Sequence, residues 1–411
     1  MSEPRGECDL VVVGAGIIGL ATARELLRRH PDMALQVLER EPAVAAHQTG
    51  HNSGVIHQGV YYQPGSLKAR LCVAGARELY DYCDARGIPA ERCGKLIVAT
   101  DAGELSRLDE LERRGVANGV PGLRRVDAEE LRQIEPHASG IAALHSPQTG
   151  IVDYARVAAA FADDVSAAGG TISTGCGVTG IEPANGRIRI VHERGETRAR
   201  HAVFCAGAWS DRLAVMAGGD ADPRIVPFRG AYRVLRPERR SLVRGMIYPV
   251  PDPELPFLGV HLTRRIDGEV LIGPSALLAG ARDGYALGRV VPDDIRSTLT
   301  WPGSYRMAWR FWRTGIDELR HVLPGGTFVA AAARYVPELR DGDVTGGFAG
   351  VRAQAVGRDG RLVDDFVFSH TERALHVRNA PSPGATSSLA IARHIADEAA
   401  RSFDLPATTA S

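Results

Sequence analysis

The hydrophobic pattern near the amino terminus predicts a strand, a glycine turn, a helix and a second strand. Residues 9–13 form a short run rich in β-branched side chains, which is typical of a strand buried on both faces. Residues 17–29 then carry apolar side chains at helical spacing, and residues 35–38 form a second apolar run that ends at Glu39. This order indicates a parallel sheet with a right-handed crossover.

Later segments continue the alternation of helices and strands. Residues 67–83 and 154–168 carry apolar side chains on one helical face, and residues 202–206 form a buried strand that leads into another glycine turn. A last helix is expected at residues 385–399. Between about residues 223 and 345, prolines interrupt strand-like runs around a helical stretch. We therefore expect a second domain there.

The first turn has the glycine spacing of a dinucleotide-binding motif. Gly14 permits the tight turn, Gly16 lets the backbone approach a pyrophosphate, and Gly19 allows close packing of helix on strand. The N-terminus of the following helix offers free N–H groups to the phosphates. Glu39 is placed to accept hydrogen bonds from ribose hydroxyls, although Arg40 beside it weakens the case against a 2′-phosphate. A structural glycine turn without a ligand is the alternative.

Composition limits the partners and the compartment. The 49 basic residues balance the 49 acidic ones, which leaves no electrostatic case for nucleic acid. None of the six cysteines forms a CxxC pair or a zinc-type spacing with histidine, so we expect no metal site and a reduced, intracellular protein. The polar first residues do not resemble a signal peptide, and the first apolar run is too short to cross a bilayer. These features favour the cytoplasm.

An aromatic and basic segment at residues 301–313 holds three of the four tryptophans. Arg306, Arg310 and Arg313 fall on one helical face, as a helix lying in a membrane interface would require. This pattern raises the possibility of a peripheral contact with the inner face of the cell membrane. Ordinary helix packing with solvated arginines is the favoured alternative, because clustered aromatic residues usually belong to a core.

A second glycine-rich block follows the second strand and carries a family resemblance. Residues 47–62, which read HQTGHNSGVIHQGVYY, resemble the signature of L-2-hydroxyglutarate dehydrogenases and oxidases. These enzymes belong to the D-amino-acid-oxidase-like family of flavoproteins. Similar segments recur at residues 66–72, 93–98, 149–154, 224–230, 248–252, 258–261, 350–354 and 376–383. The resemblance covers nearly the whole chain and is weakest from about residue 284 to 340.

The resemblance implies an α/β (α+β) two-domain fold that binds FAD non-covalently. We expect a Rossmann-like FAD-binding domain assembled from discontinuous segments and a mixed β-sheet substrate domain. The first comprises residues 1–90, 146–222 and 345–405, the second comprises residues 91–145 and 223–344, and residues 406–411 are expected to be a disordered tail. The implied reaction oxidises L-2-hydroxyglutarate to 2-oxoglutarate and passes electrons to a quinone or to O2.

Cofactor-binding residues are expected in six parts of the chain. Ser53 to Val55 should line the flavin ring, and Asn379, Ser382 and Gly384 precede a helix whose N-terminus suits an anionic reduced flavin. Helix capping and turn formation explain the last three residues equally well. The full expected set is Gly14, Gly16, Ile18, Gly19, Glu39, Arg40, Ser53, Gly54, Val55, Val178, Ala206, Gly207, Asn379, Ser382 and Gly384.

The implied substrate is a small dicarboxylate that needs two separate cationic or donor groups and a base. Arg352 is expected to clamp the α-carboxylate, because a guanidinium holds a carboxylate through two parallel hydrogen bonds. His57 and His261 are the candidate bases, since a neutral imidazole accepts a hydroxyl proton near pH 7. His51 is a third candidate, better suited to orienting the loop. The candidates for the distal carboxylate are Tyr61, Tyr62 and Lys68.

Three other functions stay open at this point. The first is oxidation of an amine, an amino acid or another 2-hydroxy acid on the same fold. The second is dinucleotide binding without catalysis, and the third is an NAD-dependent dehydrogenase. For Lys68 a solvated helix face is as plausible as a site role, and for each histidine a structural hydrogen bond is about as plausible as catalysis.

Overall fold

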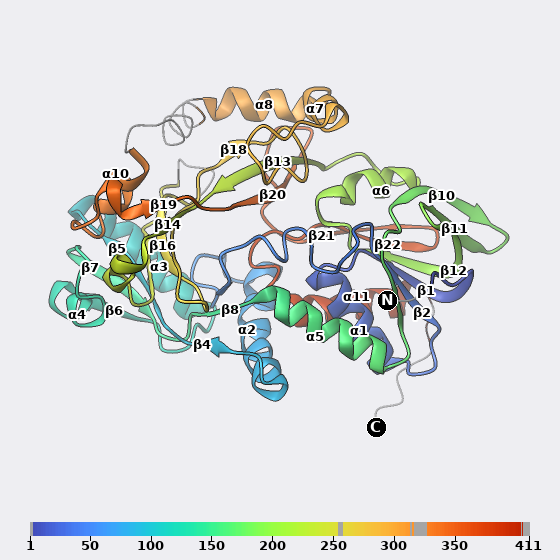
Figure 1. Cartoon of the computed structure of the whole chain (residues 1–411), viewed down its shortest axis with the longest axis horizontal. Coiled ribbons are helices and arrows are strands. Elements are labelled where there is room, and N and C mark those ends of the chain that lie inside the picture. Colours follow the sequence, from blue (N-terminus) through green and yellow to red (C-terminus); the bar gives the residue numbers. More distant parts are fainter. Residues whose placement is uncertain (1–2, 254–257, 313–314, 316–326, 404, 406–411) are drawn as a thin grey trace.

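The computed structural model describes residues 3–253, 258–312, 315, 327–403 and 405. The expected disordered tail and Arg313 lie outside these residues. Two large sheets lie toward opposite ends of the long axis of the molecule (Figure 1). No helix in the described part of the chain is both long and apolar enough to span a bilayer.

The first sheet contains the predicted parallel unit. Strand β1 pairs in parallel with β2 and with β12, and β12 pairs in parallel with β22. Within the described residues this sheet has eight strands, in the order β10-β11-β12-β1-β2-β9, with β22 joined to β12 and β21 to β22. The bounds are β1 Glu7–Val13, β2 Leu35–Leu38, β9 Thr171–Ser173, β10 Val178–Ala184, β11 Arg187–His192, β12 Gly195–Phe204, β21 Val367–Thr371 and β22 Ala374–Asn379.

Helices α1, α2, α5 and α11 pack with this sheet into one hydrophobic core. Helix α1 buries Glu25, whose carboxylate accepts hydrogen bonds from Arg28 and Arg29. Helix α2 begins after Ser66, whose hydroxyl accepts a hydrogen bond from an amide of the first turn, and ends at Gly87 in the left-handed conformation. The bounds are α1 Ile17–Arg29, α2 Leu67–Arg86, α5 Tyr154–Ala167, α6 Ser210–Met216 and α11 Ser388–Ser402.

The second sheet is mixed, as predicted. In the described residues its eight strands run in the order β19-β14-β17-β16-β15-β5-β7-β6. Strands β5 and β15 pair in parallel, and every other pair recorded in this sheet is antiparallel. The bounds are β5 Lys95–Ala99, β6 Arg124–Asp127, β7 Ala142–Ser146, β14 Arg233–Leu235, β15 Met246–Pro249, β16 His261–Arg264, β17 Val270–Gly273 and β19 Val344–Thr345, with helices α3 Leu105–Ala117, α4 Ala128–Ile134 and α10 Thr327–Ala333.

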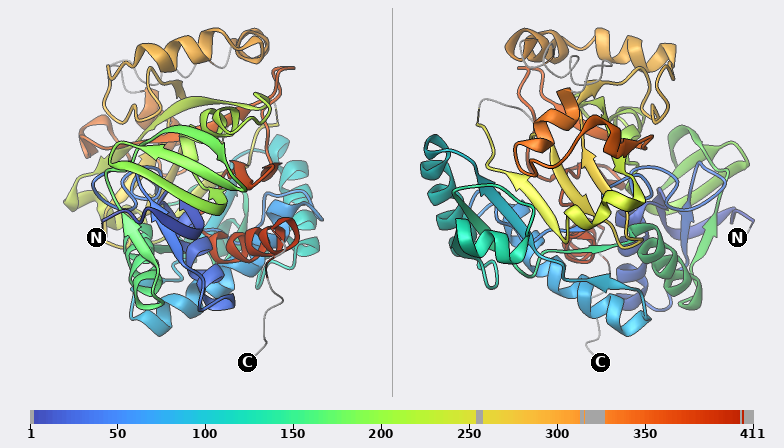
Figure 2. Two further views of the ribbon diagram at one scale, coloured as in Figure 1. Left: turned by 90° about the vertical axis from the view of Figure 1, so that its right-hand side faces the viewer. Right: turned by 60° about the vertical axis from the view of Figure 1, so that its left-hand side comes forward.

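Smaller sheets lie between the two large ones. Strands β13 (Arg224–Ala231) and β20 (Ala349–Val356) pair along their full length, and β18 (Leu277–Leu278) pairs with β13. A further three-stranded sheet contains β3 Val55–Ile56, β4 Ala90–Glu91 and β8 Gly150–Val152. Helices α7 (Pro292–Leu299) and α8 (Pro302–Arg310) lie along one outer edge of the molecule, above β13 and β20 (Figures 1 and 2).

The domain boundaries remain a prediction, and two pairings bear on them. Strands β5 to β7, from the predicted segment 91–145, join strands from 223–344 in one sheet. Strand β20 was predicted to belong with the FAD-binding segments, but it pairs with β13 of the other segment. The 345–405 segment therefore supplies strands both to the first large sheet and to the small sheet that contains β13.

Candidate functional site

A large cavity of about 1410 Å³ is lined by residues from both parts of the fold. Its wall includes the β1–α1 turn, the loop before β3, strands β15, β16 and β20, and the connection from β22 to α11. This volume exceeds the usual ~300–1,000 Å³ of a pocket for one small molecule. The cavity therefore has room for a dinucleotide and a small substrate together.

The glycine turn at one end of the cavity is tightly packed at two of its three glycines. A Cβ atom on Gly14, whose φ is +106°, would lie 2.4 Å from the carbonyl oxygen of Cys205. A Cβ on Gly19 would lie 1.9 Å from the carbonyl oxygen of Gly14. A Cβ on Gly16 would meet only the Thr49 hydroxyl, at 3.4 Å. Gly14 and Gly19 are thus required by the chain itself, whereas Gly16 leaves open the space that a ligand needs.

Glu39 joins the glycine turn to the end of β2. Its carboxylate accepts hydrogen bonds from the backbone N–H groups of Ala15 at 2.7 Å and Glu41 at 2.9 Å, and it lines the cavity. Burial raises the pKa of this carboxyl. The guanidinium of Arg40 lies 4.1 Å from the centre of the Trp209 ring.

The structure places all but one of the predicted cofactor-binding residues in the cavity wall. Gly54 is the exception, and its role beside the flavin stays a prediction. Its N–H donates to the Asn52 side chain, its carbonyl accepts from the N–H of Val152, and an added Cβ would lie 2.7 Å from the Val152 carbonyl oxygen. Gly54 therefore holds the loop against β8 and does not face the cavity.

The residues before the last helix line the cavity without capping that helix. Helix α11 begins at Ser388, three residues later than predicted, and its N-cap position is Ser387. Ser382 and Gly384 belong to the preceding turn, and both line the cavity. The side-chain amide of Asn379 donates to the carbonyl groups of Val363 and Asp365, at 3.0 and 2.9 Å. Asn379 therefore also anchors the segment that leads into β21.

Two neutral histidines face the other end of the cavity. Nδ1 of His261 lies 2.9 Å from the carbonyl oxygen of Gly259. A carbonyl oxygen only accepts, so Nδ1 carries the proton and Nε2 keeps a free lone pair. Burial lowers the pKa of His261 to about 3. Burial, followed by the positive charges of Lys95 and neighbouring groups, holds the pKa of His57 well below its usual value.

Arg352 lines the same end of the cavity from β20. Burial raises the pKa of Tyr232, and the positive charge of Arg352 partly opposes this rise. Burial lowers the pKa of His261, and the same charge lowers it further. Tyr61 and Tyr62 also line the cavity. The structure therefore brings the predicted arginine, histidines and tyrosines together, although they come from segments far apart in the sequence.

Lys68 lines the cavity but is already paired. Its ammonium donates to the carboxylate of Asp364 at 2.7 Å and to the backbone carbonyl of the same residue at 3.0 Å. It also lies 5.0 Å from the centre of the Tyr62 ring. Much of its charge is therefore compensated within the protein.

Sequence reasoning missed a buried cation, Lys95. It begins β5, is only 2% exposed, and its ammonium lies 4.6 Å from the centre of the Tyr248 ring and 5.2 Å from that of Tyr61. Burial lowers the pKa of Lys95 to about 8. The available signal was its position at the head of an uninterrupted apolar run, Lys-Leu-Ile-Val-Ala.

Comparison with known proteins agrees with this arrangement. The family described as FAD dependent oxidoreductase matches residues 9–398. The chain belongs to this family. L-2-hydroxyglutarate dehydrogenase of human mitochondria is 48% identical over 414 residues, covering 97% of this chain and 89% of the relative. The L-2-hydroxyglutarate dehydrogenase of Indibacter alkaliphilus is 43% identical over 396 residues, covering 96% and 99%.

Solved structures show the same fold for this FAD-dependent oxidoreductase. The FAD-bound, dithionite-reduced L-α-glycerophosphate oxidase from Mycoplasma pneumoniae matches with a TM-score of 0.78 and 24% identity, covering 98% of this chain and 96% of that one. Glycine oxidase from Geobacillus kaustophilus matches with a TM-score of 0.73 and 18% identity, covering 97% and 95%. The predicted fold class, the FAD cofactor and the oxidoreductase class are confirmed, and the NAD-dependent and non-catalytic alternatives are set aside.

The residues of this flavoprotein fit FAD. The open side of Gly16 and the N-terminus of α1 suit the pyrophosphate, and Glu39 lies where a ribose would follow. From there the cavity wall continues past Ser53 and Val55 to His57. When bound, the flavin supplies a two-electron acceptor for a hydride. The side chains at the end of the cavity that holds His57, His261 and Arg352, here called the inner end, then have to bind, orient and deprotonate the molecule that is oxidised.

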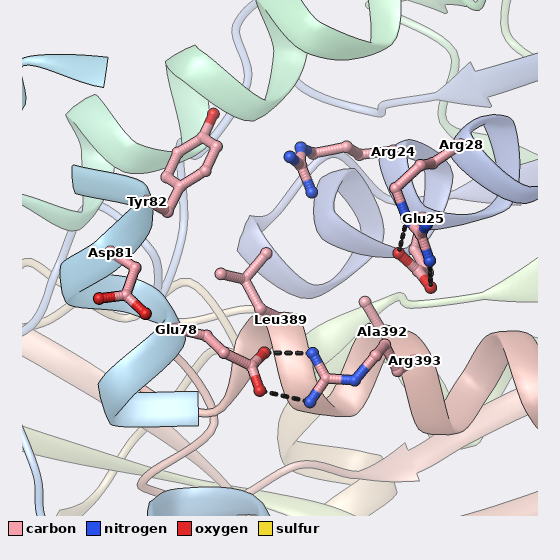
Figure 3. Close-up of a pocket in the computed structure, with 9 residues that line it drawn as sticks. All are labelled: Arg24, Glu25, Arg28, Glu78, Asp81, Tyr82, Leu389, Ala392 and Arg393. Atoms are coloured by element: carbon pink, nitrogen blue, oxygen red, sulfur yellow. Dashed lines mark hydrogen bonds and ion pairs between the residues drawn. The ribbon is translucent and has the colours of Figure 1, made fainter. Parts of the chain in front are cut away.

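A second, shallower cavity of about 300 Å³ lies on the flavoprotein's outer helices (Figure 3). Charged side chains of α1, α2 and α11 line it, and they form ion pairs. The carboxylate of Glu78 faces the guanidinium of Arg393, and Glu25 pairs with Arg28 at 2.9 Å. Because these charges compensate each other within the protein, this crevice contributes to helix packing and we assign it no ligand.

Proposed function

We propose that this flavoprotein oxidises L-2-hydroxyglutarate to 2-oxoglutarate. The observation that carries the proposal is the inner end of the cavity, where two neutral imidazoles lie beside Arg352 and the buried Lys95. A small dianion with a hydroxyl group between its charges matches this combination of bases and cations. The substrate named for the relatives at 43% and 48% identity supports the same choice.

In this proposal Arg352 binds the α-carboxylate. A guanidinium forms two parallel hydrogen bonds with a carboxylate, which fixes both the position and the rotation of the acid. Strand β20 holds Arg352 rigidly, because it pairs with β13 along eight residue pairs. The substrate's C2–H bond is thereby kept in one orientation, which is the main requirement for hydride transfer.

The pair His57 and His261 provides the base. Oxidation removes a hydride from C2 and a proton from the hydroxyl, so the two electrons leave with the hydride and the proton needs an acceptor. Both imidazoles are neutral at pH 7 because burial lowers the pKa of each. Nε2 of His261 has the free lone pair that the reaction needs, since the carbonyl of Gly259 fixes the proton on Nδ1.

An anaerobic titration tests this function. Addition of L-2-hydroxyglutarate should bleach the flavin absorbance at one equivalent, and the D enantiomer should leave it unchanged. The variants His57→Ala and His261→Ala identify which histidine is the base. Flavin reduction in the variant that lacks the base should be at least ~100-fold slower than in the wild type. Bleaching by an amino acid but not by L-2-hydroxyglutarate would replace this proposal with an amino-acid oxidase.

We also propose that the surface formed by residues 301–312 docks on an anionic membrane. The side chains of Tyr305, Trp309 and Trp312 are 60%, 83% and 55% exposed, which corrects the prediction that these aromatic residues belong to the core. Trp301 follows that prediction, since it is 1% exposed and its Nε1 donates to the carbonyl of Val356, and Phe311 packs partly buried against the same cluster. Arg306 and Arg310 on α8 are exposed as well.

This combination of exposed tryptophan and arginine suits the boundary between lipid headgroups and acyl chains. Figures 1 and 2 show α8 on the outer edge of the molecule, where a flat surface can reach it. The contact would place the protein at the inner face of the cell membrane, where a quinone can accept its electrons. O2 is the alternative acceptor.

Vesicle flotation tests the docking surface. The protein should float with vesicles of phosphatidylglycerol at low salt, and Trp309→Glu should float at least ~tenfold less. Val116→Glu is a matched control, because Val116 is also an exposed apolar residue (65%) and lies outside this surface, on helix α3. Equal flotation of wild type and Trp309→Glu, or no salt dependence, contradicts the proposal.

A further inference from the structure

The buried ammonium of Lys95 has no partner of opposite charge in the part of the chain that the structure describes. Among the described residues, no carboxylate pairs with it and no hydrogen-bond acceptor is recorded for it, although it is 2% exposed. Two aromatic rings, of Tyr61 and Tyr248, lie within 5.2 Å of it. Such contacts stabilise a cation only in part, so a buried lysine of this kind leaves net positive charge beside the cavity.

The hydroxyl of Tyr61 is the second unsatisfied group in this region. It is buried, and it has no hydrogen-bond partner among the described residues. The neighbouring hydroxyl of Tyr248 lies 3.3 Å from that of Thr263. Tyr61 lines the cavity and Lys95 does not, but the Lys95 ammonium lies against the Tyr61 ring. An anion in the cavity therefore contacts the Tyr61 side chain first and meets the Lys95 charge through the ring.

We infer that Lys95 is a positioning residue that selects a dianionic substrate, by acting through Tyr61 on the carboxylate farther from the hydroxyl. A cation over the face of a phenol ring draws electron density toward itself and strengthens the O–H as a donor. The Tyr61 hydroxyl then gives a stronger hydrogen bond to the distal carboxylate. This inference rests on the proposed function, in which Arg352 holds the other carboxylate.

The surroundings of Lys95 make its protonation measurable. The groups that face it are Tyr61, Tyr248, His57, His261, Cys72 and Cys93. Burial raises the pKa of Cys72 to about 12 and that of Cys93 to about 11, and it raises the pKa of both tyrosines. Both histidines are already neutral above pH 7. Within this group, Lys95 alone loses charge between pH 7 and 9.5.

Selectivity between two substrates isolates the effect of Lys95. L-2-Hydroxypentanoate keeps the five carbons and the α-carboxylate of L-2-hydroxyglutarate but lacks the second carboxylate. Lys95→Met should lower kcat/KM for L-2-hydroxyglutarate at least tenfold and for L-2-hydroxypentanoate less than threefold. Tyr61→Phe should change the ratio in the same direction, and the double variant should lose no more than the larger single loss. Lys95→Arg keeps the charge and should keep most of the selectivity.

The wild-type enzyme supplies a measurement that needs no variant. Its preference for the dianion should fall at least fivefold between pH 7 and 9.5, as Lys95 loses its proton. Equal losses for both substrates in Lys95→Met, additive losses in the double variant, or a wild-type preference that stays flat over this pH range would each overturn the inference. If L-2-hydroxyglutarate does not reduce the flavin of the wild-type enzyme at all, the proposed function is wrong. This result is obtained with the wild type alone, so it is distinguished from a failure of the Lys95 inference.

Discussion

At the scale of single residues, Arg352 gives the most direct test of the site. Arg352→Met removes the only guanidinium assigned to the α-carboxylate while keeping an unbranched side chain at this position. Charge-assisted hydrogen bonds contribute about 1.5–3 kcal/mol, so kcat/KM for L-2-hydroxyglutarate should fall at least ~tenfold. Steady-state kinetics with L-2-hydroxyglutarate measure the loss, and flavin content confirms that the cofactor stays bound.

A matched pair of variants controls for the loss of charge. Arg352→Lys keeps the charge but loses the planar fork, so its kcat/KM should lie between the wild type and Arg352→Met. Arg233 is an exposed arginine on β14, and Arg233→Met should leave kcat/KM unchanged. An Arg352→Met enzyme with wild-type kcat/KM would remove Arg352 from the site.

Lys95 gives a second prediction, which concerns stability. Burial lowers its pKa from the usual 10.5 to about 8. The unfolded chain therefore binds this proton more tightly than the folded protein, and the cost to the folded state is fully present below pH 8 and disappears as the pH rises toward 10.5. Lys95→Met should consequently have a higher Tm than the wild type at pH 7, and this difference should shrink at pH 9.5.

Thermal unfolding of both FAD-bound proteins at the two pH values measures that difference. A purely structural lysine predicts the opposite sign, because its removal would lower Tm at both pH values. If Lys95→Met has the higher Tm, the variant that weakens dianion selectivity is the more stable protein. This often happens where function requires an unfavourable arrangement. A pH-independent difference in Tm would show that the lysine charge does not destabilise the fold.

Most of the predicted site residues line the cavity, since they belong to motifs or to typical chemistry. The exceptions have physical reasons. Lysine is usually exposed, so Lys95 gave no signal beyond its apolar neighbours. The partner of Lys68, Asp364, lies 296 residues away, and nothing local indicates that pairing. Gly54 was assigned to the cavity wall because glycine suits both a contact with a ligand and a close approach to backbone. In the structure Gly54 closely approaches the backbone of Val152.

At the scale of elements, the glycines of the β1–α1 turn have two different roles. Gly14 and Gly19 are required for the packing of the chain, whereas Gly16 leaves space for the cofactor. Gly16→Ala adds a methyl group whose nearest neighbour in the protein is 3.4 Å away, so the protein should fold normally. The same methyl group would stand where the pyrophosphate approaches, and FAD affinity should fall at least ~tenfold, which is about 1.4 kcal/mol. Titration of the apoprotein with FAD measures this loss.

Gly19→Ala provides the contrast. Its methyl group would lie 1.9 Å from the carbonyl oxygen of Gly14, so β1 and α1 cannot keep their packing. This variant should lose both FAD and thermal stability. Gly6→Ala is the control, because nothing lies within 4 Å of its added Cβ. Equal Tm values for Gly16→Ala and Gly19→Ala would contradict this division.

Elements with local signals were predicted well. Helix α1 and strand β2 have the predicted bounds, because a strict apolar pattern and a glycine motif define them. Strand β12 begins seven residues before the predicted run at 202, since its first half is exposed on one side and forms a hairpin with β11. The pairing of β13 with β20 joins residues more than 100 positions apart, so no periodicity in either strand could reveal it.

At the scale of the whole molecule, the cavity depends on contacts between segments that are distant in sequence. The segment around β3 is held on both sides of the strand. The ring of Tyr285 stacks on His51 at 3.9 Å, and the hydroxyl of Thr386 accepts from the N–H of His57. These contacts are consistent with the loop-orienting role proposed for His51, which stays a prediction. Sequence patterns predicted the two kinds of sheet, but not the side chains that close the space between them.

This arrangement makes the cofactor a structural component, which leads to a prediction for its removal. A cavity of about 1410 Å³ that is walled by both parts of the fold leaves many side chains without packing partners when FAD is absent. A ligand that binds only the folded state at 100 times its Kd stabilises that state by about 2.7 kcal/mol. The deflavinated protein should therefore have a lower Tm, and its Tm should rise steadily with added FAD.

Limited proteolysis locates the effect. Without FAD, cleavage should appear first in the segments that enclose the cavity, at residues 45–62 and 380–387, and added FAD should suppress it. Helices α1, α5 and α11 should stay resistant in both states, because their core is built from side chains that pack without the cofactor. Cleavage that begins in those helices would mean that FAD stabilises the first sheet as a whole, and an unchanged Tm would mean that the cavity keeps its shape when empty.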